Sequence, residues 1–278
     1  MRFRRHGRIG PLLRFLSVVV VGVTTGFFRR DWRHLERIPT TGPAILAVNH
    51  VSYADPFVVA RLVWDAGRIP RFLGKAPLFG VPVVGAVLRG AGQIPVRRAT
   101  LEATDSLELA VAALHRGEIV VIYPEGTVTR DDDYWPMVAK TGVARLALLV
   151  PDAPVVPVAQ WGSQDAVDWY HRRFRLLPRT LVTVAVGSPV DTAPYRSGTA
   201  QPEASVGPAP SPQTLRALTD AIMSAVRSEL AGIRGLPAPT TFAARPPASV
   251  RKVSRLTDDL AVDDRPDDSA GRHRQVGG

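Results

Sequence analysis

The sequence predicts a single α/β domain in which a mainly parallel sheet is flanked by helices. Three observations lead to this prediction. Short apolar runs alternate along the chain with longer helical patterns, as they do where parallel strands are joined by crossover helices. The run Ala44–Val48 is apolar at every position, which is typical of a buried strand. The length of 278 residues is enough for one sizeable domain with appendages.

Six short runs are expected to form strands. In chain order they are Ala44–Asn49, Arg71–Gly74, Gln93–Val96, Glu118–Tyr123, Val155–Ala159 and Leu181–Val186. Five segments are expected to form helices, namely Tyr53–Asp65, Pro82–Arg89, Leu101–Arg116, Gly142–Leu149 and Gln213–Ile233. The last helix carries an apolar stripe, which is expected to dock on the domain.

The chain divides into three regions by composition. Residues 1–36 form a basic and apolar segment that is expected to associate with a membrane. Residues 37–235 are expected to hold the α/β domain, with a Pro/Ser-rich loop at 197–212. Residues 236–278 combine Pro clusters with Asp-Asp pairs and are predicted to be a disordered tail.

The N-terminal segment has arginines on both sides of an apolar stretch, Ile9–Phe28, and Trp32 follows it. This arrangement is typical of a segment at a membrane surface. The uncharged core, Phe15–Phe28, is 14 residues long, which is shorter than the ~20 residues of a spanning helix. An ordinary buried helix is the alternative interpretation. A cleaved signal peptide is disfavoured because no small-x-small cleavage site follows.

The formal net charge is +10, and it is concentrated in two regions. Residues 1–40 hold nine Arg and two acidic residues, and residues 61–98 hold seven Arg or Lys and one Asp. Such clusters suit phosphate groups or an anionic membrane surface. Nucleic acid would also fit the charge, but no nucleic-acid-binding motif supports it. Cysteine is absent, which excludes disulfides and thiolate chemistry.

The strongest catalytic candidates are His50 and Asp55, which follow the predicted strand Ala44–Asn49. A histidine where a strand meets a loop can accept a proton near neutral pH, and a carboxylate on its far nitrogen would fix its tautomer. The pair resembles a catalytic triad without its serine, so the substrate would supply the hydroxyl. The alternative is structural: Ser52 and Asp55 also match a helix capping signal. No histidine spacing in the chain favours zinc.

Three further sites have residues that suit a phosphorylated substrate. Tyr123–Arg130 ends an apolar strand with Glu125, Gly126 and Thr127, although Pro and Gly there could simply form a tight turn. Lys75 and Arg97 each stand near a strand end and could bind a phosphate, or they could be solvated charges.

The order of these motifs resembles the motif set of the glycerolipid acyltransferases. His-x4-Asp at 50–55 is followed by Gly-x4-Arg at 92–97, Pro-Glu-Gly-Thr at 124–127 and Pro-Val-Val-Pro at 154–157. The resemblance runs from about Arg37 to Val190 and is greatest to the bacterial 1-acylglycerol-3-phosphate acyltransferases. One departure is Val128, because members of the family often have Arg directly after Glu-Gly-Thr, whereas this chain has Arg130 two residues later.

The resemblance implies transfer of a fatty acyl group from acyl-CoA or acyl carrier protein to a lysophospholipid hydroxyl. It implies His50 as the general base and Asp55 as the group that orients it. The expected substrate-binding residues are Lys75, Arg97, Glu125, Gly126, Thr127 and Arg130. No metal or other cofactor is expected, and the expected location is the cytoplasmic face of the cell membrane. Two alternatives stay open: another lysolipid or glycolipid acceptor, and an inactive lipid-binding protein at a membrane surface.

Overall fold

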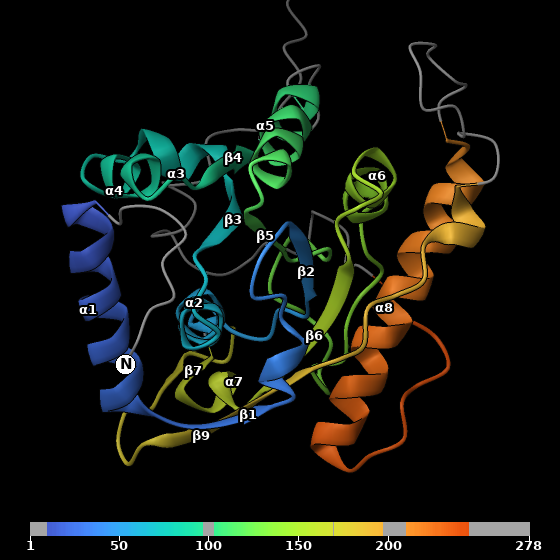
Figure 1. Cartoon of the computed structure of the whole chain (residues 1–278). Helices are drawn as coiled ribbons and strands as arrows, with labels where there is room; N and C mark the ends of the chain where they lie inside the picture. Colours follow the sequence, from blue (N-terminus) through green and yellow to red (C-terminus); the bar gives the residue numbers. More distant parts are fainter. Residues whose placement is uncertain (1–9, 97–102, 169, 197–209, 245–278) are drawn as a thin grey trace, which may run out of the picture.

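The computed structural model describes residues 10–96, 103–168, 170–196 and 210–244, and it has a central sheet covered by helices (Figure 1). The seven strands of this sheet lie in the order β1-β9-β6-β2-β5-β3-β4. Their bounds are β1 Phe28–Arg33, β2 Ala44–Val48, β3 Pro70–Lys75, β4 Ile94–Val96, β5 Ile119–Ile122, β6 Val155–Trp161 and β9 Thr180–Val186. A separate short hairpin pairs β7, Val167–Asp168, with β8, Arg173–Phe174.

Most strand pairs are parallel, as predicted. The exception is the pairing of β9 with β6, which is antiparallel. Since β1 pairs in parallel with β9, these two strands run opposite to the other five. All six predicted strands are present with small changes at their ends.

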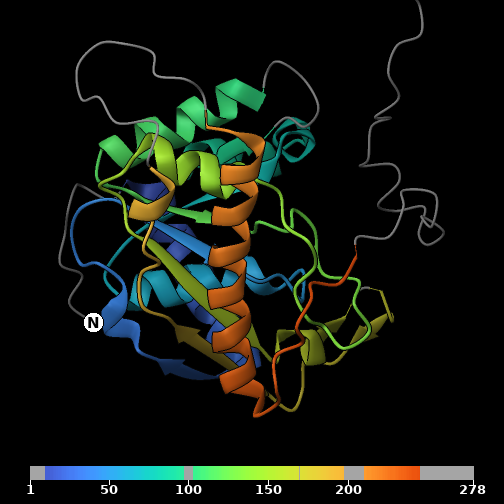
Figure 2. The same ribbon diagram turned by 90° about the vertical axis from the view of Figure 1, so that its right-hand side faces the viewer.

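The helices cover both faces of the sheet. They are α1 Pro11–Phe27, α2 Asp55–Asp65, α3 Ala76–Gly80, α4 Val84–Gly90, α5 Ala103–His115, α6 Gly142–Leu149, α7 Ser163–Ala166 and α8 Pro212–Arg234, with short 3-10 turns at Leu35–Arg37 and Ala193–Tyr195. All five predicted helices are present, although the predicted start of α5 at Leu101 lies outside the described residues. Figure 2 shows α8 running across one face of the sheet.

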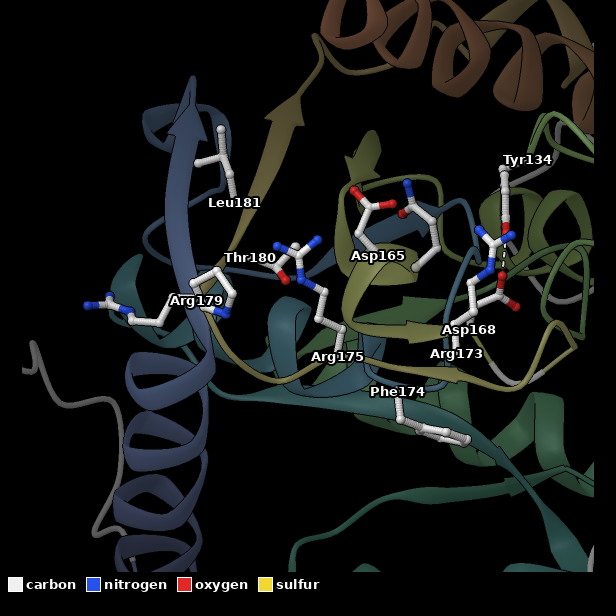
Figure 3. Close-up of a pocket in the computed structure, with 11 residues that line it drawn as sticks. Tyr134, Asp165, Asp168, Arg173, Phe174, Arg175, Arg179, Thr180 and Leu181 are labelled. Carbon is white, nitrogen blue, oxygen red and sulfur yellow. Dashed lines mark hydrogen bonds between the residues drawn. The ribbon is translucent and has the colours of Figure 1, made fainter.

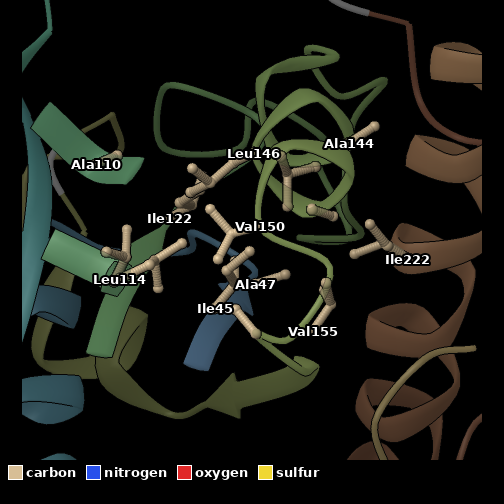
Figure 4. Packing of buried hydrophobic residues seen from close by; sticks show 14 of the residues in the cluster. Ile45, Ala47, Ala110, Leu114, Ile122, Ala144, Leu146, Val150, Val155 and Ile222 are labelled. Carbon is tan, nitrogen blue, oxygen red and sulfur yellow. The ribbon is translucent and has the colours of Figure 1, made fainter. Parts of the chain in front are cut away.

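Alternating strand residues point into two separate cores. One core joins Ile45, Val120 and Val155 of the sheet to α5, α6 and α8 (Figure 4). The other joins Leu46 and Val121 to residues of α2 on the opposite face. Because successive side chains of a strand point to opposite faces, strands that are apolar throughout can fill both cores.

The N-terminal segment is part of the domain, which differs from the predicted division at residue 36. Residues 28–33 form the edge strand β1, and α1 packs on α2, where Arg61 Nη1 donates to Thr25 Oγ1 at 3.2 Å. Trp32, predicted to lie at a membrane interface, donates from Nε1 to Asp65 Oδ2 at 2.9 Å. Strand β1 was missed because its sequence, FRRDWR, has no apolar run: an edge strand needs few buried side chains.

The start of the predicted disordered tail is ordered. Residues 236–244 turn back along the domain, and the Val138 N–H donates to the Ala243 carbonyl at 3.0 Å. Arg227 of α8 also stacks on Phe242, with its guanidinium carbon 4.3 Å from the ring centroid. The prediction of disorder from Leu236 is therefore wrong for these residues, and residues 245–278 lie outside the described ranges.

Candidate active site

His50 lies just beyond the carboxyl end of β2, the strand at the middle of the sheet. Both backbone groups of His50 are held by the loop that follows the neighbouring strand β5. The His50 N–H donates to Glu125 Oε1 at 3.0 Å, and the His50 carbonyl accepts from the Thr129 N–H at 2.7 Å. The backbone beneath the imidazole is therefore fixed from two sides.

The imidazole is oriented by Asp55, the first residue of α2. His50 Nδ1 lies 2.8 Å from Asp55 Oδ2, and Asp55 is completely buried. The same oxygen accepts from the backbone N–H groups of Val51 and Ser52 at 2.7 and 2.9 Å, and Ser163 Oγ donates to Oδ1 at 2.5 Å. Besides the imidazole, three donors therefore fix the position of the Asp55 carboxylate. It can hold Nδ1 protonated, so that Nε2 is the nitrogen able to accept a proton.

The capping interpretation of Ser52 and Asp55 holds in part. Asp55 lies in the first turn of α2 and accepts the Ser52 N–H, but the N-cap residue is Ala54 and no side chain caps it. Ser52 Oγ instead accepts the Ala54 N–H and donates to the Val167 carbonyl at 2.7 Å. Asp55 therefore serves the start of α2 and the imidazole together, while Ser52 ties this loop to the β7–β8 hairpin.

Tyr123 and the hydrogen-bonded pair Asn49 and Gln160 complete the environment of His50. The ring of Tyr123 stacks on the imidazole, with centroids 4.3 Å apart and an interplanar angle of 24°. Burial of the phenol and the nearby charge of Asp55 raise the pKa of Tyr123 well above its ordinary value, so this group stays neutral. Asn49 and Gln160 exchange three hydrogen bonds of 2.8 to 3.0 Å, which fasten the end of β2 to β6.

Glu125 was expected to contact the substrate, but the structure gives it a different position. It is completely buried, and its carboxylate accepts the N–H groups of His50 and, at 2.9 Å, Met137. The Glu125 carboxylate therefore fixes the backbone of His50 and of Met137. Gly126 has a φ of +72°, and its N–H donates to the Tyr123 carbonyl at 2.8 Å, so this glycine permits the turn that brings Glu125 under His50.

The Tyr53 ring centroid lies 6.5 Å from that of His50, and Tyr53 belongs to a group of four side chains that we call the mouth cluster: Tyr53, Thr127, Arg130 and Tyr170. Tyr170 shares hydrogen bonds with the other three, and the Arg130 guanidinium lies over its ring at 5.6 Å. Burial and the adjacent phenol of Tyr170 raise the pKa of Tyr53 to about 12. Burial also opposes ionisation of Tyr170, but hydrogen bonds from Arg130 and Thr127 outweigh it and lower the Tyr170 pKa.

The departure at Val128 has a structural explanation. Val128 is buried, so an arginine in its place would point into the protein. Arg130 instead reaches the mouth cluster, where its Nε is buried and has no hydrogen-bond partner among the described residues. Arg130 as a whole is half-buried, so the outer nitrogens of its guanidinium, and not the enclosed Nε, suit an anionic group of a ligand.

Of the two remaining predicted binding residues, the structure describes Lys75, which lies farther along the same sheet edge. Lys75 ends β3 and is exposed; β5 separates this strand from β2, and Lys75 pairs in register with Val96 of β4. Arg97 directly follows β4 but lies outside the described residues. Because carboxyl ends of parallel strands meet at one edge, Lys75 and His50 share that edge without being adjacent.

Ser163 and Tyr170 were not predicted from the sequence. Ser163 begins α7, 108 residues after Asp55, and Tyr170 lies in the turn of the β7–β8 hairpin. Neither stands in a motif, so no local signal pointed to them. Within the described ranges, no group of three or more His, Asp or Glu side chains is placed to hold a metal ion.

Comparisons with known proteins agree with this geometry. Residues 29–161 match the family model described as Acyltransferase, and this span contains both His50–Asp55 and Glu125–Thr127. The resemblance of the motifs to the acyltransferases is therefore confirmed over residues 29–161, which are just under half of the chain.

Four curated relatives of this chain are named as 1-acyl-sn-glycerol-3-phosphate acyltransferases. The chain is 28% identical to BAT2, a chloroplastic member from Brassica napus, over 58% of this chain and 44% of that protein. It is 24% identical to a member from Bacillus subtilis (strain 168), over 69% of this chain and 83% of that protein. The chain thus spans less than half of the length of the chloroplast relative.

A crystal structure with a similar fold is that of PlsC from Thermotoga maritima, described as a 1-acyl-sn-glycerophosphate (LPA) acyltransferase. The TM-score is 0.57 at 20% sequence identity, and the match covers 82% of this chain and 81% of that chain. This likeness confirms the α/β domain with its mostly parallel sheet and flanking helices.

Proposed function

We propose that this protein transfers a fatty acyl group from acyl-CoA or acyl carrier protein to the hydroxyl of 1-acylglycerol-3-phosphate, which yields phosphatidic acid for phospholipid synthesis. The observation that carries the proposal is the His50–Asp55 pair, in which Nδ1 of His50 lies 2.8 Å from Oδ2 of Asp55. The backbone of His50 is held by the loop that contains Glu125. The acyltransferase family match and the names of the curated relatives support the reaction and the acceptor.

In the proposed mechanism, His50 Nε2 removes the proton from the acceptor hydroxyl as its oxygen attacks the thioester carbonyl. The carbonyl becomes a tetrahedral oxyanion, and the imidazolium is stabilised by the Asp55 carboxylate. Collapse of this intermediate breaks the carbon–sulfur bond, and the departing thiolate takes the proton from His50. The products are the acylated acceptor and free thiol, and no covalent acyl-enzyme forms, which is consistent with the absence of cysteine.

The phosphate of the acceptor is proposed to bind the half-buried guanidinium of Arg130 in the mouth cluster, where Arg130 and Thr127 both hydrogen-bond to Tyr170. Lys75, farther along the sheet edge, is proposed to add positive charge, and Arg97 is proposed to do so from its place in the sequence motif. The proposed donor and acceptor are the only small molecules required, with no metal or other cofactor. Since Arg130 is displaced from the position after Thr127, a different lysolipid or glycolipid acceptor is the second candidate.

The proposed location is the cytoplasmic face of the cell membrane, where a lysolipid acceptor would be present. Support comes from α1, on which Phe15 and Val18 are exposed although they are large and apolar. None of the described helices is long and apolar enough to cross a bilayer.

The direct test is acceptor-dependent release of thiol from acyl-CoA by the purified protein, wild type beside His50→Ala. We expect the variant to lose roughly 10²–10⁴ in kcat because the general base is removed. The matched control is His115→Ala, since His115 is an exposed histidine at the end of α5. It should leave the rate unchanged.

The outcomes separate the candidate functions. Release with 1-acylglycerol-3-phosphate that disappears in His50→Ala supports the proposal. Release only with other lysolipids would keep the chemistry and change the acceptor. If the wild-type protein released no thiol with any acceptor or with either donor, the inactive lipid-binding protein would be favoured instead.

A further inference from the structure

Residues 170–181 form a surface segment that is both apolar and basic. It begins in the turn of the β7–β8 hairpin and ends in β9. Phe174 and Leu177 are 59% and 72% exposed, and Tyr170, Leu176 and Leu181 are also exposed. Single exposed apolar side chains are common, but five within twelve residues indicate a surface that meets an apolar partner.

The segment is also strongly basic. It contains Arg172, Arg173, Arg175 and Arg179 and no Asp or Glu. Three of these arginines line a cleft of about 670 Å³ that also includes Asp165 and Asp168. Figure 3 shows Phe174 pointing away from these two carboxylates. Asp168 is already engaged by Tyr134 and His171, so the arginines leave an excess of positive charge on this surface.

We propose that segment 170–181 is a membrane contact, in which Phe174, Leu176 and Leu177 enter the interfacial layer of a bilayer and the arginines bind the phosphates of anionic lipids. Arginine is suited to this position because its apolar stem can lie along the acyl boundary while its guanidinium reaches the head groups. A water-soluble anion would satisfy the arginines but would leave the apolar side chains exposed, so an anionic bilayer fits the surface better.

The position of the segment relative to His50 gives this contact a role, which rests on the proposed function. Ser52, two residues after His50, donates to the Val167 carbonyl at 2.7 Å, at the base of the hairpin. Tyr170 of the segment belongs to the mouth cluster. A bilayer in contact with the segment would therefore lie beside the candidate active site. A lipid acceptor could then move from the bilayer to His50 without first dissolving in water.

The segment is also continuous with the end of α1. Leu181 is paired in register with Arg29, and Arg179 Nη2 donates to the Phe28 carbonyl at 3.0 Å. The exposed arginines of β1 thus extend the same basic surface. This continuity predicts two adjoining membrane contacts, one on α1 and one on segment 170–181.

The test is flotation of the full chain with vesicles of phosphatidylcholine alone or mixed with phosphatidylglycerol. Phe174→Ser/Leu177→Ser should weaken binding to the mixed vesicles at least tenfold, because two large apolar side chains are lost. Arg172→Gln/Arg175→Gln should weaken binding to the mixed vesicles roughly tenfold at low salt. The difference in binding between this variant and the wild type should be smaller at high salt. The matched control, Arg145→Gln/Leu149→Ser, removes an exposed arginine and leucine from α6 and should bind like the wild type.

A second measurement does not depend on loss of binding. In Leu177→Trp, the tryptophan emission should shift to shorter wavelength when mixed vesicles are added, because the indole enters the interfacial layer. An unshifted emission would overturn the proposal, as would unchanged flotation of both segment variants. Separation of a wild-type dimer into monomers by these variants, with vesicle binding unchanged, would assign the surface to self-association instead.

Activity in detergent distinguishes this proposal from the proposed function. The segment variants should release thiol at the wild-type rate from a detergent-dispersed acceptor, because they leave His50 and the mouth cluster intact. If the wild-type protein lacked that activity but its vesicle binding still depended on the segment, the proposed function would fail while the membrane contact stood.

Discussion

The molecule contains two His–Asp pairs with similar contacts and very different surroundings. His50 Nδ1 lies 2.8 Å from Asp55, and His171 Nδ1 lies 2.6 Å from Asp168. Each aspartate also accepts a side-chain hydroxyl at 2.5 Å, from Ser163 in the first pair and from Tyr134 in the second. Short distances between an imidazole and a carboxylate therefore do not distinguish the candidate catalytic pair.

The difference lies in what surrounds each imidazole. The His50 side chain is 14% exposed and lies at the end of a central strand, whereas the His171 side chain is 49% exposed in a hairpin turn. The backbone of His50 is held on both sides by the loop after β5. A general base needs a fixed position and partial exclusion of water, and only the first pair has both.

Asp55→Asn should give the largest difference between the two pairs. The amide keeps the shape of the side chain but cannot stabilise the imidazolium, so kcat should fall by roughly 10²–10⁴. The equivalent change in the other pair, Asp168→Asn, should alter kcat less than twofold. Steady-state thiol release measures both. Similar losses in the two variants would show that the comparison of their surroundings is mistaken.

Ser163→Ala tests whether the hydroxyl on Asp55 matters for catalysis. Loss of one hydrogen bond to a charged carboxylate should lower kcat about tenfold with little change in KM, since the bond orients the base and does not touch substrate. Tyr134→Phe removes the corresponding hydroxyl from Asp168 and serves as the control, with kcat expected to stay unchanged. A rise in KM alone in Ser163→Ala would contradict a role in orienting His50.

Tyr170→Phe should have a smaller effect, because Tyr170 holds Arg130 and Thr127 in the mouth cluster without reaching Asp55. We expect KM for a phosphorylated acceptor to rise about threefold while kcat stays within twofold. Arg130→Ala should raise the same constant more strongly. If KM rose equally for acceptors with and without a phosphate, the cluster would not be a phosphate site.

The smallest expected effect is on the titration of Tyr134, which donates a hydrogen bond to Asp168 of the second pair. Burial and the hydrogen bond to Asp168 raise the pKa of Tyr134 from 10 to about 12. A raised folded-state pKa means that this stabilisation is present below pH 10 and is lost as pH rises toward 12. The phenolate absorbance of wild type minus Tyr134→Phe should therefore appear near pH 12. A difference signal centred near pH 10 would show that the hydrogen bond is not formed.

Local pattern explains why much of this protein could be predicted from its sequence. The buried strands are apolar runs, and the helices have apolar stripes, so each element is marked by its own residues. His50 and Asp55 stand at the two ends of the loop between β2 and α2, and their separation of five residues lets this loop bring them into contact. The turn at Gly126 is local in the same way.

The features that could not be predicted depend on strand order. Strand β1 has a polar sequence and becomes a strand only because β9 offers it a partner. Glu125 was assigned to the substrate from its motif, but β5 lies beside β2 and carries this carboxylate under His50. The residues around Glu125 do not indicate which strand will lie beside β5 in the sheet.

The sequence by itself determined most of the α/β elements, the His50–Asp55 pair and the acyltransferase resemblance, because each of these elements and motifs consists of neighbouring residues. Only the tertiary structure decided that Ser163, 108 residues away, completes the hydrogen bonds of Asp55 and that Tyr170 meets Arg130 beside the imidazole. Such contacts arise from long-range packing of strands and hairpins, whose free energy belongs to the assembled fold and leaves no pattern along the chain.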